Sequence, residues 1–119
     1  MSSAYPRRGE IWTANLGSPP TRHWVLIVSL DGRNERAQSV LIVPFGSQFA
    51  IGPTVLALEP GETGLPERSI LRGHFITTIN KSILIERAGR ALSDRRMREA
   101  CAVIRRAFDP DAPFNPKKN

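Results

Sequence analysis

Cysteine and histidine are scarce in this chain. It has one cysteine and two histidines among 119 residues. A single thiol cannot form an internal disulfide, and Cys101, His23 and His74 lie too far apart in the sequence to match the spacing of a zinc motif. We therefore expect no disulfide, no metal site and no cofactor, and a reducing, cytoplasmic setting.

Long hydrophobic runs are also missing. The apolar runs are far shorter than the ~20 residues that cross a bilayer, and residues 1–6 lack the apolar centre of a signal peptide. We expect no membrane contact. Because only 119 residues are present, 40% of them hydrophobic and 24% charged, the composition predicts one soluble globular domain.

Positive charge is what the chain has in excess. Lysine and arginine together number 17 against 11 acidic residues, which gives a net charge of +6 and a pI near 10.7. Cationic side chains gain from phosphates and from the counterions that phosphates release, and arginine binds phosphate with two hydrogen bonds. The excess favours a polyanionic partner such as nucleic acid, and a solvated basic surface is the alternative.

Short apolar segments between glycine and proline turns predict a mainly β fold. The segment Trp24–Ser29 is almost wholly apolar and rich in β-branched residues, which is typical of a central strand buried on both faces. Gly73 interrupts the last strand and indicates a bulge or sharp bend. Strands this short predict a small barrel. The expected strands cover 11–16, 24–29, 39–44, 54–58 and 69–79, with a turn at 31–34.

One helix is expected near the C-terminus. Ser93 is a good N-cap, Asp94 follows in the first turn, and 95–108 contains neither glycine nor proline. An apolar stripe at helical spacing predicts that one face packs on the barrel, and it consists of Met97, Ala100, Cys101, Ile104 and Phe108. We place one domain at 1–108, with its helix at about 93–108, and a Pro-rich, flexible tail at 109–119.

The strongest candidate site precedes the buried strand. A Pro-broken segment ends in Arg22, His23 and Trp24, and the apolar residues 25–28 follow directly. We interpret this segment as a loop that brings a cation and an imidazole together at the mouth of a strand. Phosphate chemistry uses such a pair, because arginine binds the phosphate and histidine exchanges protons near neutral pH.

Several motifs follow one another in a recognisable order. They are RGEIW at 8–12, RHW at 22–24, VLIVS at 25–29, SVLIVPFGSQ at 39–48, GLPERSILRGHFITTINKSIL at 64–84 and LSD at 92–94. Each is weak alone, and their order and spacing are more specific together. The chain thereby resembles the MazF/PemK (Kid-like) toxin endoribonucleases of bacterial toxin–antitoxin systems over nearly the whole predicted domain.

That resemblance implies a fold, a reaction and partners. The fold would be mainly β with a C-terminal helix, a small SH3-like β-barrel of the MazF, PemK and CcdB kind, usually in a homodimer. The reaction would be metal-independent cleavage of single-stranded RNA, in which the ribose 2′-hydroxyl is the nucleophile. The protein partner would be an antitoxin whose acidic segment occupies the same basic groove as RNA.

The resemblance also maps functional positions. In the family, an arginine before the second strand and a threonine after the third strand's proline carry much of the chemistry. These positions fall on His23 and Gly46 of this chain. We assign three catalytic residues, Arg22, His23 and Ser47, and three assisting residues, His74, Gly46 and Thr78. The RNA-binding residues expected from stacking and phosphate contact are Trp24, Arg33, Arg36, Gln48 and Arg72.

Two alternatives remain open, because both catalytic positions differ from the family pattern. The chain could be a catalytically silent relative that still binds nucleic acid or protein. It could instead act on a DNA topoisomerase, as a CcdB-like gyrase-directed toxin does.

Overall fold

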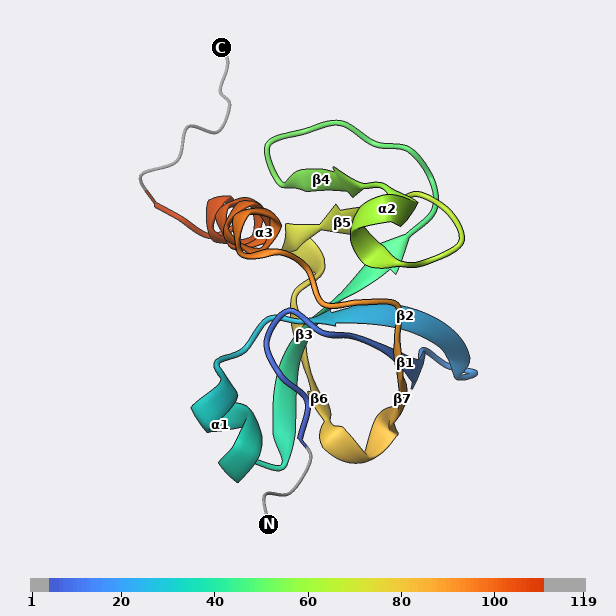
Figure 1. Ribbon diagram of the computed structural model, residues 1–119. Helices are drawn as coiled ribbons and strands as arrows, with labels where there is room; N and C mark the ends of the chain where they lie inside the picture. The colour runs from blue at the N-terminus through green and yellow to red at the C-terminus, as the bar shows by residue number, and fades with distance from the viewer. Residues whose placement is uncertain (1–4, 111–119) are drawn as a thin grey trace.

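The computed structural model describes residues 5–110. Seven strands, three α-helices and two short 3₁₀ segments alternate along these residues (Figure 1). In chain order the elements are β1 (Ile11–Leu16), β2 (Thr21–Ile27), α1 (Asp31–Arg36), β3 (Ser39–Gly46), β4 (Val55–Leu58), α2 (Pro60–Thr63), β5 (Ser69–Arg72), η1 (Gly73–Phe75), β6 (Thr77–Asn80), η2 (Lys81–Ile83), β7 (Leu84–Ala88) and α3 (Asp94–Arg106). The expected tail at 109–119 lies almost wholly outside this range.

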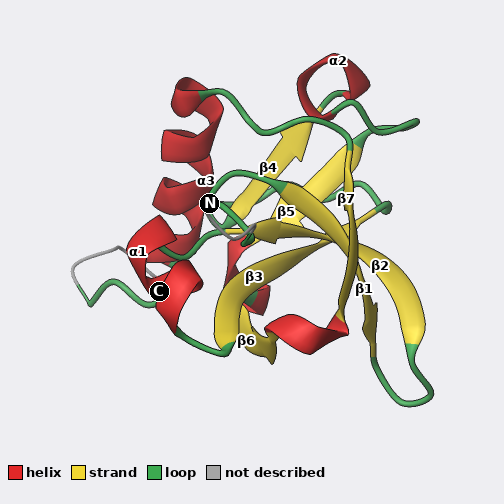
Figure 2. Cartoon of the chain, turned by 60° about the horizontal axis from the view of Figure 1, so that its bottom comes forward, coloured by secondary structure: helices red, strands yellow, loops and turns green. Residues whose placement is uncertain are grey.

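The strands form one antiparallel sheet around the long central strand β3. The sheet order is β4-β5-β3-β2-β1-β7, and β6 pairs with the start of β3 off this path. Strands β4 and β7 end the order, so the described sheet is barrel-like but not closed. The mainly β fold with a C-terminal helix is confirmed, and Figure 2 shows β1 and β2 curving away from β4 and β5.

Strand β2 is buried on both faces at 25–27, as its apolar sequence predicts, but Trp24, which was expected in the same buried segment, is exposed. Val25, Leu26 and Ile27 have no exposed surface. Because successive side chains of a strand point to opposite faces, Leu26 joins the core beneath α3, whereas Val25 and Ile27 join a second core formed with β3 and β6. The two cores make β2 and β3 the shared centre of the domain.

Helix α3 begins where the sequence predicts. The Ser93 hydroxyl accepts a hydrogen bond from the Arg96 backbone N–H at 3.2 Å, and Met97, Ala100 and Ile104 are buried. Phe108, expected on the same stripe, lies past the last helical residue and is 67% exposed. The sequence pattern missed this because the spacing alone does not mark where the helix ends.

Two local predictions are wrong for a common reason. Arg22, His23 and Trp24 belong to β2, not to a loop, because the turn falls earlier, around Gly17. Residues 31–34 open the helix α1 instead of forming a turn. In both places polar residues suggested a loop, but backbone pairing with β1 or a single helical turn satisfies their N–H and C=O groups.

The glycine break at Gly73 is confirmed as a sharp bend. It separates β5 from β6 through η1, so the predicted single strand at 69–79 is two strands that pair with different parts of β3. A Cβ atom at Gly73 would lie 2.6 Å from the Val103 carbonyl oxygen. Only glycine therefore allows η1 to approach α3 this closely. Strand β7 was not predicted at all.

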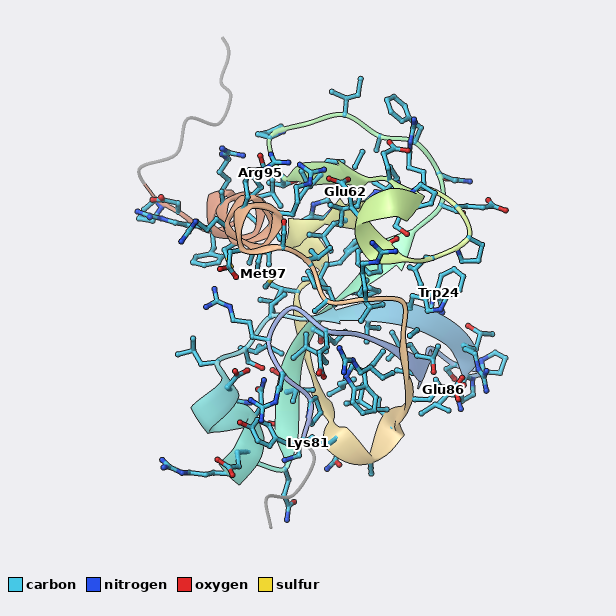
Figure 3. All side chains as sticks on the ribbon, viewed as in Figure 1. Trp24, Glu62, Lys81, Glu86, Arg95 and Met97 are labelled. Carbon is cyan, nitrogen blue, oxygen red and sulfur yellow. The ribbon has the colours of Figure 1, made fainter. Side chains whose placement is uncertain are left out.

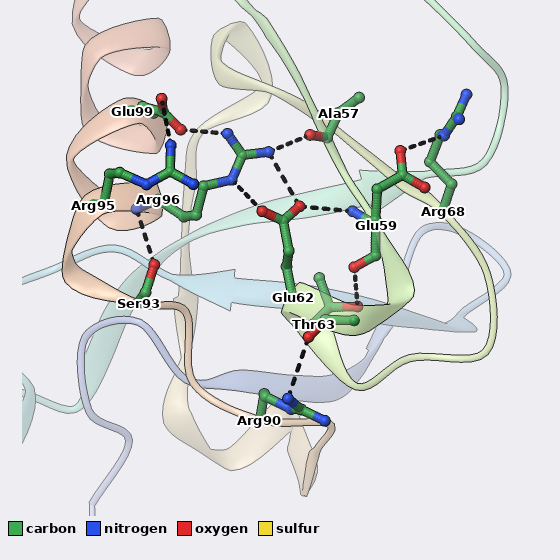
Figure 4. Close-up of polar contacts among 11 residues, drawn as sticks. Ala57, Glu59, Glu62, Thr63, Arg68, Arg90, Ser93, Arg95, Arg96 and Glu99 are labelled. Carbon is green, nitrogen blue, oxygen red and sulfur yellow. Dashed lines mark hydrogen bonds and ion pairs between the residues drawn. The ribbon is translucent and has the colours of Figure 1, made fainter.

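An ionic network fastens α3 to the β4–α2 corner (Figure 4). The Arg96 side chain is only 15% exposed; its Nε lies 2.8 Å from Glu62 Oε2 and its Nη2 donates to the Ala57 carbonyl at 2.7 Å. Arg96 also pairs with Glu99. One guanidinium thus joins three elements at a half-buried site.

We expect Arg96→Met to lower the free energy of unfolding by about 2 kcal/mol, because Glu62 and the Ala57 carbonyl lose their half-buried partner. Urea denaturation would measure the loss. Arg95→Met is the matched control, since Arg95 is 72% exposed and pairs only with Glu99. Equal losses in the two variants would contradict the role of the network.

Acid should weaken the same corner through Glu62. The Glu59 backbone N–H, and then Arg96, hold the pKa of Glu62 below its usual 4.5. A lowered native pKa stabilises the fold above pH 4.5, and this contribution disappears as the pH falls through the native pKa. The free energy of unfolding of the wild type should therefore exceed that of Glu62→Gln by a constant amount near neutral pH. This difference should become smaller below pH 4.5. A difference that grew on acidification would refute this sign.

Candidate functional site

A groove opens where β3 changes its partner. Val43 and Pro44 pair with β2, but Phe45 and Gly46 pair with β5. The β2 and β5 halves of the sheet therefore diverge at this point, and a cavity of about 830 Å³ lies between them. Its lining comprises Thr13, Arg22, His23, Trp24, Phe45, Gly46, Ser47, Pro66, Glu67, Arg68, Ser69, Glu86, Arg87 and Ala88.

One wall of the groove is a row of residues that crosses three strands. Trp24 of β2 pairs with Thr13 of β1, and Thr13 pairs with Glu86 of β7. Antiparallel partners share a face, and Arg22 is two residues from Trp24, so all four side chains belong to the groove face. Trp24 and Glu86 lie on the same side of the molecule, at the right of Figure 3.

His23 borders the groove but its side chain belongs to the opposite face. It pairs with Ala14, a member of the second core, and its Nε2 is hydrogen-bonded at 2.8 Å to the hydroxyl of Thr21. Residues 21–24 of β2 pair with β1 alone, because β3 joins β2 only from Val25 onward. The edge of β2 is therefore open here, and Arg22 and His23 flank it from opposite faces.

Arg72 organises the end of the groove at β3. Its Nη2 donates to the Gln48 carbonyl oxygen at 3.0 Å. Its guanidinium lies across Gly46, where a Cβ atom would collide with Nη1. Ser47, which lies between Gly46 and Gln48 in the chain, is exposed and lines the groove. The missing side chain at Gly46 thus makes room for the Arg72 guanidinium at the end of β3.

The groove contains both bound and free charges. Arg68 Nε lies 2.8 Å from Glu59, and Arg87 lies 3.4 Å from the buried carboxylate of Glu10. Within residues 5–110, by contrast, the side chains of Arg22, Glu67 and Glu86 have no ion pair or hydrogen bond. Arg22 is therefore available to an anionic ligand, and the two glutamates to donors.

The predicted site residues divide into two groups. Arg22, His23, Trp24, Gly46 and Ser47 line the groove, and Gln48 and Arg72 adjoin it. The other predicted residues lie outside its lining. Arg33 donates to the Ser39 carbonyl beside α1, and Arg36 ends α1. Thr78 of β6 pairs with Leu41 of β3, and His74 of η1 is hydrogen-bonded at 3.0 Å to Thr54.

Sequence reasoning missed several groove residues. Thr13, Glu67, Glu86 and Arg87 line the groove and were not proposed, and Arg68 was not among the assigned residues. Glu86 and Arg87 belong to β7, whose sequence, Leu-Ile-Glu-Arg-Ala, does not alternate between apolar and polar residues. Without that alternation the segment carries no signal of a half-buried strand.

Two searches of residues 5–110 bear on other classes of site. They contain no group of three histidine, cysteine or acidic side chains placed to hold a metal ion. None of the helices in this range is long and apolar enough to cross a membrane.

The fold and groove define a class of small β protein with a charged cleft, and comparison with known proteins identifies the family. A model of the PemK-like, MazF-like toxins of type II toxin–antitoxin systems matches residues 7–108. The chain is 31% identical over 110 residues to a Mycobacterium tuberculosis protein named probable endoribonuclease MazF5, covering 90% of this chain and 96% of that protein. The chain belongs to the PemK-like, MazF-like toxin family.

Solved structures of similar fold agree with this assignment. An endoribonuclease in complex with its cognate antitoxin, from a mycobacterial species, superposes with a TM-score of 0.78 at 24% identity, over 91% of this chain and 99% of that one. The MazE–MazF complex of Deinococcus radiodurans superposes with a TM-score of 0.73 at 13% identity, over 90% and 98%. These likenesses extend to the whole fold.

We expect Gly46→Ala to loosen the loop that follows β3. The added methyl group occupies the place of the Arg72 guanidinium, which then loses the Gln48 carbonyl. Amide hydrogen exchange should become faster at 47–54 and stay unchanged in the β2 core. Gly32→Ala, where a Cβ atom meets nothing within 4 Å, is the control. Unchanged exchange at 47–54 would show that Arg72 does not hold this loop.

Proposed function

We propose that the chain is the toxin of a type II toxin–antitoxin system and cuts single-stranded RNA in the groove beside β2. The family membership supports the toxin class, and the name of the M. tuberculosis relative supports RNA cleavage. The observation that carries the site is the unpaired guanidinium of Arg22 at the open edge of β2. The comparisons give no support to a silent binding module or a gyrase-directed toxin, so we propose neither.

The groove residues suit cleavage by the RNA's own 2′-hydroxyl. Arg22 binds the scissile phosphate and stabilises the charge that develops on it. His23, across the strand edge, accepts the proton of the 2′-hydroxyl and returns a proton to the leaving 5′-oxygen. Ser47 donates to a phosphate oxygen from the end of β3. The products are a 2′,3′-cyclic phosphate and a 5′-hydroxyl end, and this chemistry requires no metal-bound water.

The predicted residues that lie outside the groove lining contact parts of the RNA farther from the scissile phosphate. Arg72 and Gln48 bind the RNA strand beyond Ser47, next to Gly46. His74 assists from η1, where its ring nitrogen now meets Thr54. Thr78, Arg33 and Arg36 contact an RNA strand that continues past β3 toward α1. These contacts require a substrate longer than the groove itself.

The partners follow from the charge of the groove. An antitoxin with an acidic segment competes with RNA for Arg22, because one cationic surface attracts both anions. The mycobacterial endoribonuclease solved with its cognate antitoxin supports this partner class, as does the MazE–MazF complex. We further propose that the toxin acts as a homodimer in the cytoplasm, as the family resemblance implies.

Substitution of Arg22 should abolish most cleavage. With a long single-stranded RNA in EDTA, we expect wild type to cleave and Arg22→Ala to cleave about 100-fold more slowly, because the phosphorane charge loses its charged donor. His23→Ala should also reduce the rate. Mapping of the RNA ends measures both rate and product.

Arg98→Ala is the matched control for that loss, since Arg98 is an exposed arginine on the outer surface of α3. It removes the same charge outside the groove and should cleave as wild type does. Absence of wild-type cleavage over several RNAs would refute the nuclease. Full activity of Arg22→Ala would refute the site. An acidic antitoxin segment added before the RNA should protect it.

A further inference from the structure

The row that crosses three strands in the groove has a chemistry that phosphate binding does not use. Its members are an aromatic ring on β2, a short side chain on β1 and a carboxylate on β7, in the order Trp24, Thr13, Glu86. Phosphate repels a carboxylate, so Glu86 does not bind the phosphates of an RNA strand. The donors that RNA offers to a free carboxylate are the ribose 2′-hydroxyls and the base edges, and only the base edges differ from one nucleotide to the next.

Trp24 offers a flat surface to such a base. The indole is 38% exposed and lines the groove. Stacking of a base on an exposed aromatic ring is favourable for every base, because each has a π-face. Trp24 can therefore hold a base without choosing which base it is.

Thr13 holds the space between the two ends of the row open. It is 5% exposed, and its hydroxyl is occupied by the Glu86 backbone, donating to the carbonyl and accepting from the N–H, each at 3.3 Å. This double contact fixes β7 at Glu86 and leaves no polar group of Thr13 for a ligand. Because β2 and β7 are two strand spacings apart, about 10 Å separates their backbones. A base stacked on Trp24 thus has its edge within reach of Glu86.

Only one base matches a carboxylate at that edge. An ionised carboxylate is acceptor-only and can accept two parallel hydrogen bonds. Guanine offers two adjacent donors, N1–H and the N2 amino group, on its Watson–Crick edge. Adenine and cytosine each offer one donor beside an acceptor nitrogen, and uracil offers one donor flanked by two carbonyls, so each places an acceptor against the carboxylate.

We propose that Trp24 and Glu86 form a guanine-reading subsite, with Thr13 as the positioning residue between them. This inference rests on the proposed RNA cleavage and deepens it by naming one base of the recognised sequence. Glu86 is a specificity residue and takes no part in the bond-breaking step. The carboxylate accepts from guanine N1–H and N2–H, while Arg22, on the same face of β2, binds the phosphate.

Glu86→Gln tests the subsite, because it changes hydrogen-bonding pattern without changing shape. A glutamine amide presents one acceptor and one donor, which matches the N6 amino group and N1 of adenine. In the bound and cleaved fractions of a random single-stranded RNA pool, wild type should enrich guanine at one position. Glu86→Gln should shift the guanine-to-adenine ratio there by about tenfold toward adenine, the discrimination of one bidentate pair.

Three variants serve as controls. Glu35→Gln makes the same chemical change on α1, outside the groove, and should leave both rate and base preference unchanged. Glu67→Gln removes the other free carboxylate of the groove and should leave the base preference unchanged, which separates a specific role from a loss of negative charge. Trp24→Ala should weaken all sequences together, and Trp24→Phe should restore binding.

The outcomes separate this inference from the function on which it rests. If wild type neither binds nor cleaves the pool, the proposed function fails. If wild type binds or cleaves but Glu86→Gln keeps its base preference, or merely slows all sequences equally, the subsite is refuted and the function stands. The subsite is also refuted if the preference that Glu86→Gln loses is for a base other than guanine. It is refuted as well if Glu86→Gln leaves the enriched sequences unchanged and weakens antitoxin binding instead.

Discussion

The change of partner along β3 is the constraint on which the rest of the molecule depends. The strand pairs with β6 and β2 from Ser39 to Pro44 and with β5 only through Phe45 and Gly46. Pro44 lies at the change, and a proline suits a position where pairing is being given up. The divergence of the two half-sheets creates the groove, and it also creates the two separate cores on either face of β2. The site is therefore a product of the sheet topology and not of a loop added to it.

Most of the fold could be predicted from the sequence because it follows from local periodicity. The apolar run at 25–27 marks β2, and Ser93 marks the start of α3. The predictions that failed concern segments whose structure depends on pairing with residues distant in the chain. Arg22 to Trp24 look like a loop, and they become a strand because β1 pairs with them. Strand β7 lacks the alternating pattern of a half-buried strand, and it forms because β1 offers an edge for it to pair with.

The candidate site shows the same division. Its β2 residues and Ser47 could be found, because motif order placed them. Glu86 could not, since nothing local connects residue 86 with residue 24. The opposite orientation of Arg22 and His23 could not be predicted either, because it requires this segment to be a strand, and only the pairing with Ala14 and Asn15 of β1 makes it one. Gly46 looked like a lost catalytic group, whereas the structure shows the space it leaves filled by Arg72.

The groove also couples binding to folding. Its two walls belong to half-sheets that share few backbone contacts beyond β3, and β5 and β2 are not neighbours in the sheet. A ligand that contacts both walls resists their separation, and it contributes that resistance only in the native state. Because the ligand binds only the native state, the free energy of unfolding then rises with the logarithm of the ligand concentration. A toxin bound to its antitoxin should therefore unfold less often than the free toxin, and proteases should degrade it more slowly.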